Sequence, residues 1–487
     1  MLNFNQLSLF DINSHFREYI IENNSSFFDY FHDLINFSNL IPYEFYRKYY
    51  KHLGAKRTYS LESMLLLLIY KNFLGIANMN TLLNILADSD DLRFALGLPK
   101  LPNKSTVSKF KNTFVNELDL FLANLVEKIN PLLEDYFGEL HKNLIVDTTG
   151  IEAYVTENNP KFLQTEVRKA KSYKKQLEST DPQKAKGFDH YKFAFGNMPK
   201  KASANQDIKF AYLNGHFGYY LKAVIITDGN GIIQDIQFPD DIKEFSNDKM
   251  PKEIKDEFDA VSLIPSLELF KTKHDLSQFS NFLGDSGFDA VDNYKYLYQN
   301  DLRPFIPINK RGAKSHKSTL FTKDNDQTNF YYDEQGNLIC KQESINMKHN
   351  GPLREKGRAD RISFKCPKVK IKTVDGIKTP IINCKSPCSD AKWGRKVNIP
   401  VDYNYRFNTS FPRASEKWQN EFKTRPVCER SINQFKQCLN LNSSFVRNTN
   451  SLKADVFLAA ITQVISALIL IKSNELEHIL SIKSLAS

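Results

Sequence analysis

The sequence predicts an α/β protein with a helical N-terminal region, and three observations lead to that fold class. Helical periodicity dominates up to about residue 135, strand and helix patterns alternate between residues 136 and 311, and helical periodicity returns near Ser415. The length of 487 residues exceeds what one hydrophobic core usually covers. The hydrophobic fraction of 41% and the charged fraction of 25% are ordinary for globular proteins. We therefore expect several folded domains.

The N-terminal region is expected to be helical throughout. Residues 1–54 are crowded with aromatic side chains on a mostly helical pattern, for which packing is the default explanation. Leu61–Tyr70 is predicted to be a buried helix and Asn80–Leu86 a second. A third helix is predicted over Ser105–Phe114, with Ser105 as its N-cap.

The third helix is a candidate DNA-binding element. At helical spacing, its predicted buried face consists of Val107, Phe110 and Phe114. Lys104, Lys109 and Lys111 point outward instead, and basic side chains on the first turns of a helix suit contacts with DNA phosphates. The alternative is a solvated face on a three-helix bundle.

Residues 141–310 are predicted to form a mixed core. An apolar strand leads into Asp147, and a long polar excursion with the basic cluster Arg168–Lys175 follows it. The two runs Gly218–Thr227 and Ile232–Phe238 flank Asp-Gly-Asn-Gly, which predicts a hairpin. A helix around residues 262–279, a strand ending at Asp285 and a strand over Leu302–Ile308 complete the pattern. This order is the one expected of an RNase H-like core.

Three carboxylates are candidates for a catalytic metal site. Asp147 and Asp285 are predicted at the ends of buried strands, and Glu429 lies on a later helix. Converging carboxylates can hold two Mg²⁺ ions, which suit in-line displacement at phosphorus. A single Asp at a strand end is often only a turn former. The sequence Gly-Asp-Ser-Gly around Asp285 also occurs around the nucleophile of trypsin-like proteases, where a further glycine follows it. Here Phe288 stands in place of that glycine, and the α/β pattern also excludes that class.

The segment around Glu429 carries the most specific spacing. Arg425 precedes Glu429 by four residues and Lys436 follows it by seven, which aligns the three side chains on one helical face. The acid could bind a metal while the cations bind phosphates. The alternative is an exposed helix held by ion pairs. Pro426 predicts a helix start at this point, which would put Arg425 at the cap.

Charge and composition favour a polyanionic partner inside the cell. Lys and Arg outnumber Asp and Glu by 66 to 56, which gives a net charge of +10 and a pI near 9.0. The N-terminus has no basic stretch followed by a long apolar one, so a cytoplasmic location without membrane contact is expected. The apolar run Val456–Ile471 is short for a membrane span and is predicted to be a core helix.

Residues 312–410 are predicted to be an insertion. They are polar, rich in lysine and thin in apolar side chains, and they hold four of the six cysteines: Cys340, Cys366, Cys384 and Cys388. Four thiolates could form a structural Zn²⁺ site that stabilises a region lacking a core of its own. The alternative is that these cysteines are simply reduced.

The chain resembles bacterial insertion-sequence transposases of the DDE type. In these proteins the third acidic residue lies in a Tyr-x₂-Arg-x₃-Glu-x₆-Lys signature, which Arg425, Glu429 and Lys436 match while Phe422 replaces the tyrosine. The segment from residue 61 to 114, especially Pro102–Lys111, is similar to the helical N-terminal domain of these transposases. The resemblance spans roughly residues 55 to 475.

The resemblance implies the chemistry and the partners. Asp147 would bridge two Mg²⁺ or Mn²⁺ ions, and Asp285 and Glu429 would each bind one of them. Arg425 and Lys436, together with the adjacent Arg430, would contact DNA. The substrates would be double-stranded DNA, namely the element's terminal inverted repeats and a target, bound by a homodimer. Cleavage with water would precede strand transfer by a DNA 3′-hydroxyl.

The resemblance also implies a domain order. It consists of an aromatic-rich helical segment (1–54), a helical DNA-binding domain (55–135), the first part of an RNase H-like catalytic core (136–311), an insertion between the second Asp and the Glu (312–410), and a C-terminal helical part of the core (411–487). Two other functions stay open. One is an RNase H-like nuclease that cuts without joining, and the other is a non-catalytic DNA-binding protein derived from a transposase.

Overall fold

The structure is a computed structural model that describes residues 36–51, 56–213, 215–243, 259–309, 330–333, 336–374, 377–443 and 445–481. Most of the predicted segment 1–54 and the first part of the predicted insertion lie outside the described residues. Contacts divide the chain into two compact units, which are described separately. Unit 1 comprises Met1–Gly138, Thr148–Pro239 and Cys428–Ser487, and unit 2 comprises Glu139–Asp147 and Asp240–Val427.

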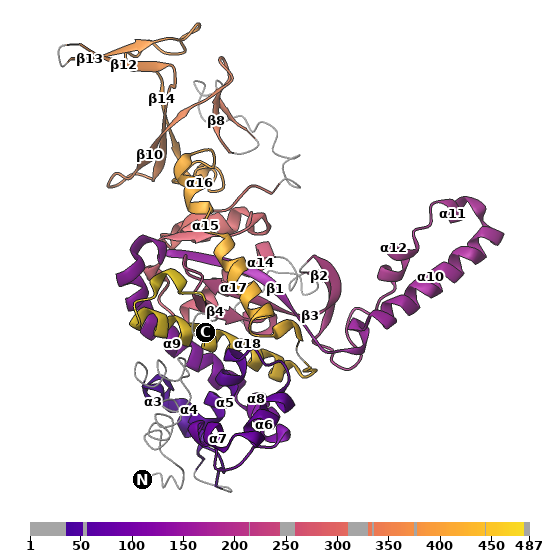
Figure 1. The fold of residues 1–487 in the computed structure, drawn as a ribbon. Helices are drawn as coiled ribbons and strands as arrows, with labels where there is room; N and C mark the ends of the chain where they lie inside the picture. The colour runs from indigo at the N-terminus through magenta and orange to yellow at the C-terminus, as the bar shows by residue number, and fades with distance from the viewer. Residues whose placement is uncertain are drawn as a thin grey trace. The chain divides into compact units, whose positions relative to one another are not determined.

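The N-terminal part of unit 1 is helical, as the sequence predicts (Figure 1). Its helices are α3 (Phe37–Leu40), α4 (Tyr43–Tyr49), α5 (Leu61–Phe73), α6 (Met79–Asp88), α7 (Asp90–Ala95), α8 (Lys104–Thr113) and α9 (Val115–Phe137). Helix α5 begins after Ser60, whose side chain accepts a hydrogen bond from the backbone N–H of Ser63. The first two helices predicted from periodicity are therefore confirmed as α5 and α6.

The third predicted helix is α8, but its predicted N-cap was wrong. Asn103 occupies the cap position, because its carbonyl already accepts the first helical hydrogen bonds, so Ser105 lies inside the first turn. The predicted buried face is confirmed, since Val107, Phe110 and Phe114 are all buried. Apolar spacing thus identified the helix face, whereas a favourable cap residue type did not identify the boundary.

Helix α18 (Thr449–Lys472) is the central helix of unit 1. It packs against α5, α8 and α9, and nearly every residue from Val456 to Ile471 is buried. By length and composition α18 could cross a membrane, but 94% of its most apolar stretch is buried inside the protein. The predicted core helix is therefore confirmed.

The largest sheet has the strand order β2-β3-β1-β5-β6, with β4 paired to β3. Its strands are β1 (Asn143–Glu152), β2 (Lys209–Leu213), β3 (His216–Thr227), β4 (Ile233–Gln237), β5 (Asn281–Leu283) and β6 (Arg303–Phe305). The predicted hairpin is confirmed, because β3 and β4 pair antiparallel. The carboxylate of Asp228 closes its turn by accepting hydrogen bonds from the backbone N–H groups of Asn230 and Ile232.

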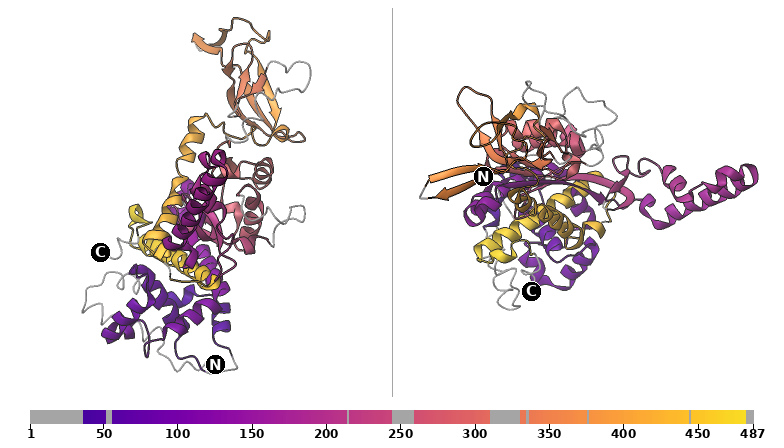
Figure 2. Two further views of the ribbon diagram at one scale, coloured as in Figure 1. Left: turned by 90° about the vertical axis from the view of Figure 1, so that its right-hand side faces the viewer. Right: turned by 90° about the horizontal axis from the view of Figure 1, so that it is seen from above.

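Residues 160–196 of unit 1 form a helical arm, where the sequence suggested only a polar excursion. The arm contains α10 (Pro160–Thr180), α11 (Pro182–Lys186) and α12 (His190–Gly196), and α10 and α12 pack together (Figures 1 and 2). The Tyr173 ring stacks on Phe193 with 5.1 Å between centroids, and Phe188 contacts both rings. These rings join the helices of the arm although Tyr173 is 42% exposed, and the buried side chains of the arm are those of Ala170, Ala185 and Ala194. The basic cluster Arg168–Lys175 lies on α10.

Unit 2 contains the parallel part of the large sheet. Strand β5 pairs in parallel with both β1 and β6, which confirms the strands predicted before Asp285 and within Leu302–Ile308. Its helices include α14 (Asp259–Lys271), α15 (Val291–Gln299) and α16 (Glu416–Phe422). Two further helices, α13 (Pro239–Lys243) and α17 (Pro426–Gln437), each have residues in both units. The helix predicted around residues 262–279 is shorter than expected, because α14 ends at Lys271.

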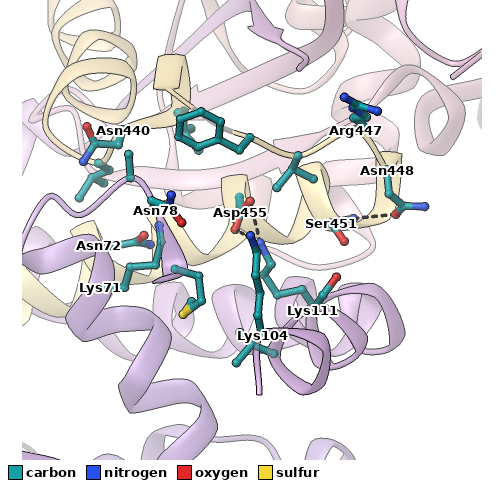
Figure 3. Close-up of a pocket in the computed structure, with 18 residues that line it drawn as sticks. Lys71, Asn72, Asn78, Lys104, Lys111, Asn440, Arg447, Asn448, Ser451 and Asp455 are labelled. Carbon is teal, nitrogen blue, oxygen red and sulfur yellow. Dashed lines mark hydrogen bonds and ion pairs between the residues drawn. The ribbon is translucent and has the colours of Figure 1, made fainter. Parts of the chain in front are cut away.

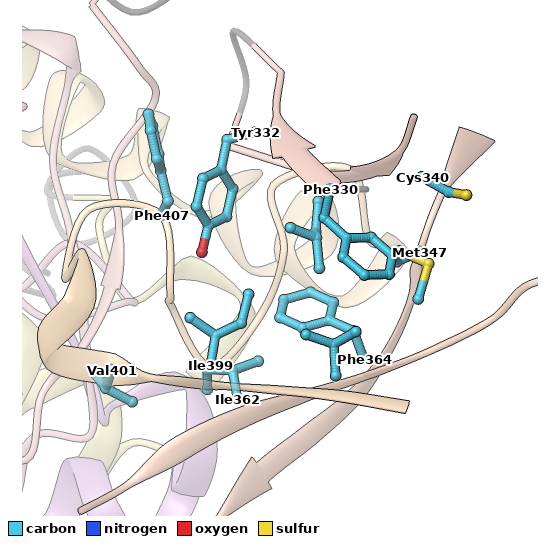
Figure 4. Packing of buried hydrophobic residues seen from close by; sticks show 11 residues of the cluster. Phe330, Tyr332, Cys340, Met347, Ile362, Phe364, Ile399, Val401 and Phe407 are labelled. Atoms are coloured by element: carbon cyan, nitrogen blue, oxygen red, sulfur yellow. The ribbon is translucent and has the colours of Figure 1, made fainter. Parts of the chain in front are cut away.

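The predicted insertion is a β-rich subdomain of unit 2. Its strands are β7 (Phe330–Tyr332), β8 (Leu338–Cys340), β9 (Ile345–Asn346), β10 (Lys348–Leu353), β11 (Arg361–Lys365), β12 (Val369–Val374), β13 (Ile377–Ile382) and β14 (Lys396–Pro400). Buried side chains including Phe330, Tyr332, Ile362, Phe364 and Ile399 pack into one cluster (Figure 4). The expectation that this region lacks a core of its own was therefore wrong.

Hydrogen bonds and a buried ion pair connect this subdomain to α15 and to residues next to α15 and β6. Arg406 donates to the carboxylate of Asp289, with both side chains almost fully buried, and Nε of Arg413 donates to the backbone carbonyl of Ile306 at 2.9 Å. Tyr298 of α15 donates to the carboxylate of Asp360 at 2.5 Å. Because Asp289 follows Asp285 by four residues, the subdomain is attached beside one of the predicted catalytic carboxylates.

Candidate functional site

Asp147 lies within strand β1 of the large sheet. The prediction that it ends a strand was wrong, because β1 continues to Glu152. The residues of β1 that precede Asp147 are buried. Asp147 is less buried, with 16% of its side chain exposed, and Thr148 is half-buried as well. The change from apolar to polar side chains therefore marks two less buried positions within the strand, because residues 149–151 are buried again.

Asp285 follows strand β5, as predicted. Its carboxylate accepts a hydrogen bond of 2.8 Å from the backbone N–H of Gly287. The glycine at position 284 has a packing role, because a Cβ there would lie 2.8 Å from the Phe288 ring and 3.0 Å from the Phe282 ring. The glycines before and after Asp285 thus give it a close turn behind the strand.

The register of β1 and β5 relates Asp147, within β1, to Asp285, which follows β5. Strands β1 and β5 are parallel, and Ile145 pairs with Leu283. Each aspartate comes two residues after its paired residue, and side chains two residues apart share a face of a sheet. The register thus leaves Asp147 and Asp285 equally far beyond the last paired residues, and the approach of their carboxylates stays a prediction.

Arg425 is the cation next to this pair. One of its terminal nitrogens lies 3.0 Å from Oδ2 of Asp147, and both side chains are only 16% exposed. Helix α17 begins at the next residue, Pro426, which confirms that Arg425 precedes the helix. The guanidinium therefore balances the charge of a half-buried carboxylate, and it does so from the start of the helix that carries Glu429.

Glu429, Arg430 and Lys436 all lie on α17. Glu429 and Arg430 are exposed in its first turns, and Lys436 is half-buried in its last turn. These three residues belong to unit 1, whereas Asp147 and Asp285 belong to unit 2. The convergence of all three carboxylates therefore stays a prediction.

Phe422 occupies the place of the signature tyrosine. It ends α16 and its ring stacks on Trp418 with 4.7 Å between centroids and an interplanar angle of 18°. Trp418 is buried, and Phe422 is half-buried. The aromatic ring is thus kept as a packing element even though the hydroxyl is absent.

The lysines of α8 have different environments. Lys104 and Lys109 are exposed, whereas the ammonium of Lys111 lies 2.7 and 2.9 Å from the two oxygens of Asp455. Only 12% of the Lys111 side chain is exposed. Lys111 is therefore already paired within unit 1, and DNA contact by these lysines stays a prediction.

The four cysteines of the insertion lie in one part of its β-structure. Cys340 ends β8, Cys366 follows β11, and Cys384 and Cys388 follow β13. The Cys384 thiol lies 3.6 Å from a carboxylate oxygen of Glu343, which is in the turn after Cys340. Burial raises the pKa of the Cys388 thiol, and the nearby thiols of Cys340 and Cys366 raise it further.

No side chains of the described residues form a ready metal site. Among them, no group of three or more His, Cys, Asp or Glu is arranged to hold a metal ion. Asp147 and Asp285 supply carboxylate oxygens, the donors that Mg²⁺ prefers, but they are only two. The cysteines are free thiols in the structure. Both the Mg²⁺ site and the Zn²⁺ site therefore stay predictions.

Sequence reasoning did not find a polar pocket in unit 1. Lys71, Asn78, Phe445 and Arg447 line it together with α8 residues. These side chains come from three segments that are far apart in the sequence, and none stands in a recognisable motif. Lys104 and Lys111 are the lining residues for which the sequence predicted a function, namely contact with DNA.

Comparison with known proteins identifies the N-terminal region. Residues 15–113 match the family model described as Transposase domain (DUF772). The matched range contains α5, α6 and α8. No curated protein matches the chain. The family match supports a transposase role for this protein.

Proposed function

We propose that this protein is a DNA transposase that cleaves the ends of its own insertion sequence and joins the 3′ ends to target DNA by a two-metal DDE mechanism. The observation that carries the proposal is the parallel register of β1 and β5 in unit 2, in which Asp147 and Asp285 each come two residues after the paired residues Ile145 and Leu283. The family match at residues 15–113 supports a transposase in general. The DDE chemistry goes beyond that match.

The sheet topology supports an RNase H-like core. Strands β3 and β4 form an antiparallel hairpin, β5 pairs in parallel with β1 and β6, and β1 lies between β3 and β5. The order β4-β3-β1-β5-β6 would correspond to an RNase H-like sheet, with β2 as an addition. The subdomain formed by β7 to β14 would be the insertion between the second Asp and the Glu.

Asp147, Asp285 and Glu429 would hold two Mg²⁺ or Mn²⁺ ions. Carboxylate oxygens suit these hard cations, and the Arg425 guanidinium beside Asp147 indicates that this carboxylate needs a cationic neighbour. When bound, the ions would activate the attacking oxygen and stabilise the leaving one. Arg425 would leave Asp147 for a DNA phosphate, which suits its planar, bidentate guanidinium.

The remaining cations would bind and orient DNA. Lys436 and Arg430 lie on the same helix as Glu429, so phosphates that they hold would be fixed relative to that carboxylate. Lys104 and Lys109 of α8 would contact a second stretch of DNA. By analogy with the family, two copies of the chain would act on paired DNA ends in the cytoplasm.

Cleavage of DNA that carries the sequences flanking the gene tests this function. Purified protein with Mg²⁺ is expected to nick such DNA at the inverted repeats, and Asp147→Asn and Asp285→Asn are each expected to abolish the nick. Asp292→Asn is the matched control, because Asp292 is an exposed residue in the first turn of α15. Normal cleavage by either of the first two variants would contradict the proposed centre.

The two other functions differ in the products. An RNase H-like nuclease would cut the same DNA without forming a joined strand-transfer product. A DNA-binding protein derived from a transposase would bind the repeats without cutting them. The positions of Asp147 and Asp285, each two residues after the pair of Ile145 and Leu283, favour a catalytic protein over a non-catalytic DNA-binding protein.

A further inference from the structure

Unit 1 contains a polar pocket, of whose lining residues the proposed function above uses only Lys104. Its volume is about 360 Å³, within the range of small-ligand sites (Figure 3). Residues near the starts of α6, α8 and α18 line it, together with the segment before α18. The side chains that carry the argument are Asn78, Lys104, Lys71, Phe445, Arg447 and Asn448.

The pocket has an excess of positive charge. Four cationic side chains line it, and Asp455 is the one carboxylate among the lining residues. Asp455 is already paired with Lys111. Within the described part of the chain, Lys104 and Lys71 form no ion pair with a carboxylate. Burial lowers the pKa of Lys71, the nearby Lys111 lowers it further, and Asp455 offsets this in part. A bound anion would favour the charged form of Lys71.

The N-terminus of α8 adds to the attraction for an anion. Its cap residue, Asn103, makes no side-chain hydrogen bond to the helix, whereas Asn78 and Asn448 cap α6 and α18. Uncapped N–H groups at a helix start attract phosphate. Lys104, the first residue of α8, extends into the pocket in Figure 3. The charge and the helix end therefore favour the same kind of ligand.

An aromatic surface borders the pocket. Phe445 lines it with 57% of the residue exposed, and its ring contacts Tyr154, which is 47% exposed, at 5.4 Å between centroids. The guanidinium of Arg447 lies 5.3 Å from the centre of the Tyr154 ring. Exposed rings next to a cation are the platforms on which nucleobases stack. The asparagine amides could contact the edge of such a base.

We propose that this pocket binds one unpaired nucleotide of a DNA strand, with its phosphate at Lys104 and Lys71 and its base against Phe445. The inference rests on the proposed function in that the strand is the DNA on which the protein acts. A paired duplex cannot fill a pocket of this kind, because its bases are stacked inside the helix. Taking a base out of the stack costs least where the base is already unpaired.

Binding to matched DNA duplexes tests the proposal. One duplex is fully paired, a second carries a single unpaired thymidine, and a third carries an abasic nucleotide at that position. The third duplex bends like the second but lacks the base. We expect the full-length protein, without metal, to bind the second duplex about tenfold more tightly than the third, because base stacking on an aromatic ring is sequence-tolerant and favourable.

Two variants and one control locate the effect. Phe445→Ala is expected to remove the preference for the base. Lys104→Ala is expected to weaken binding of the unpaired duplexes and to leave the fully paired duplex less affected. Lys109→Ala is the matched control, because Lys109 is an exposed lysine on the same helix that does not line the pocket. It should weaken binding of all three duplexes equally. All three side chains are exposed, so the variants should fold.

The outcomes separate the inference from the proposed function. Equal binding of all three duplexes by the unmodified protein would overturn the nucleotide pocket while leaving the transposase proposal intact. Failure to bind any DNA would contradict both. Tight binding of free thymidine monophosphate without a preference for the unpaired duplex would identify a small-molecule site, and would also overturn the proposal. A preference lost in Lys109→Ala but kept in Lys104→Ala would place the nucleotide elsewhere.

Discussion

Glu429 is an exposed carboxylate in the first turn of α17. We expect Glu429→Gln to abolish Mg²⁺-dependent DNA cleavage and to leave DNA binding nearly unchanged, because the amide keeps the side-chain volume but lacks the anionic oxygen that a metal needs. A gel assay of nicked product and fluorescence anisotropy of labelled DNA measure the two effects. Loss of the favourable helix-end charge should cost less than about 1 kcal/mol in stability.

Glu416→Gln is the matched control for this change. Glu416 is likewise an exposed glutamate in the first turn of a helix, α16, so the same helix-end charge is lost. It should cleave normally. Equal loss of cleavage in both variants would attribute the effect to helix charge, and full cleavage by Glu429→Gln would remove Glu429 from the mechanism.

The buried ion pair between Arg406 and Asp289 is the strongest candidate for a single-residue effect on stability. The exposed fractions of the two side chains are 7% and 0%. Removing one member of such a pair leaves a buried charge, so Arg406→Ala should lower the free energy of unfolding by about 3–5 kcal/mol. Urea unfolding measures this. Arg354→Ala is the control, because Arg354 is 66% exposed and its pairing should contribute about 1 kcal/mol or less.

The same pair predicts a pH dependence of known sign. Burial alone would raise the pKa of Asp289, but hydrogen bonds from Arg406 and from the backbone of Asn309 outweigh it and lower the pKa below its usual range. The stabilisation is therefore fully present above the unfolded pKa, about 3.9, and is lost as the pH falls toward the folded value. Arg406→Ala should accordingly show less loss of stability on acidification than the unmodified protein.

At the scale of elements, the sequence predicts best where one local pattern decides the structure. Apolar periodicity identified α5, α6 and α18, and the Asp228 turn identified the hairpin of β3 and β4. It failed where contacts between distant segments decide. The continuation of β1 past Asp147 is one such case, and the β-core of the insertion is another, because its apolar residues are spread between lysines.

The candidate site shows the same division. The residue types and spacing of Asp285, Arg425 and Glu429 made them candidates from the sequence alone, and the helix start at Pro426 was predicted correctly. The ion pair between Arg425 and Asp147 was not, since it joins residues that are 278 positions apart. The arm formed by α10 and α12 was also missed, because each of these helices buries a single alanine, Ala170 or Ala194, and so shows no apolar periodicity.

A structural Zn²⁺ site in the insertion is the prediction that belongs to this scale. Cys340, Cys366, Cys384 and Cys388 follow or end strands of one subdomain, and the nearby thiols of Cys340 and Cys366 help to raise the pKa of the Cys388 thiol. The thiols would have to turn toward a common point, because the described residues hold no ready metal group. We expect about one zinc ion per chain in protein purified without chelator.

Elemental analysis with two variants decides this. Cys384→Ser should lose the zinc and lower the thermal unfolding temperature of the protein. Cys438→Ser is the control, since Cys438 lies at the end of α17 outside the insertion. A zinc content below about 0.2 per chain in the unmodified protein would leave the four cysteines as ordinary thiols, against the single ion that a closed four-thiolate site holds.

At the scale of the whole molecule, the proposed function needs both units. Asp147 and Asp285 lie in unit 2, while α8, the polar pocket and Glu429 belong to unit 1. The chain passes from unit 2 to unit 1 within β1, directly after Asp147, and again within α17, between Val427 and Cys428.

Convergence of the three carboxylates on one metal centre is therefore the prediction that tests the molecule as a whole. Fe²⁺ bound in place of Mg²⁺ generates hydroxyl radicals with peroxide and ascorbate, and these cut the backbone near the metal. We expect cuts of the DNA-bound protein near Asp147, Asp285 and Glu429, identified by mass spectrometry. Asp147→Asn should lose all three cuts, whereas Asp292→Asn should keep them. Cuts near Asp147 and Asp285 without one near Glu429 would exclude Glu429 from the centre.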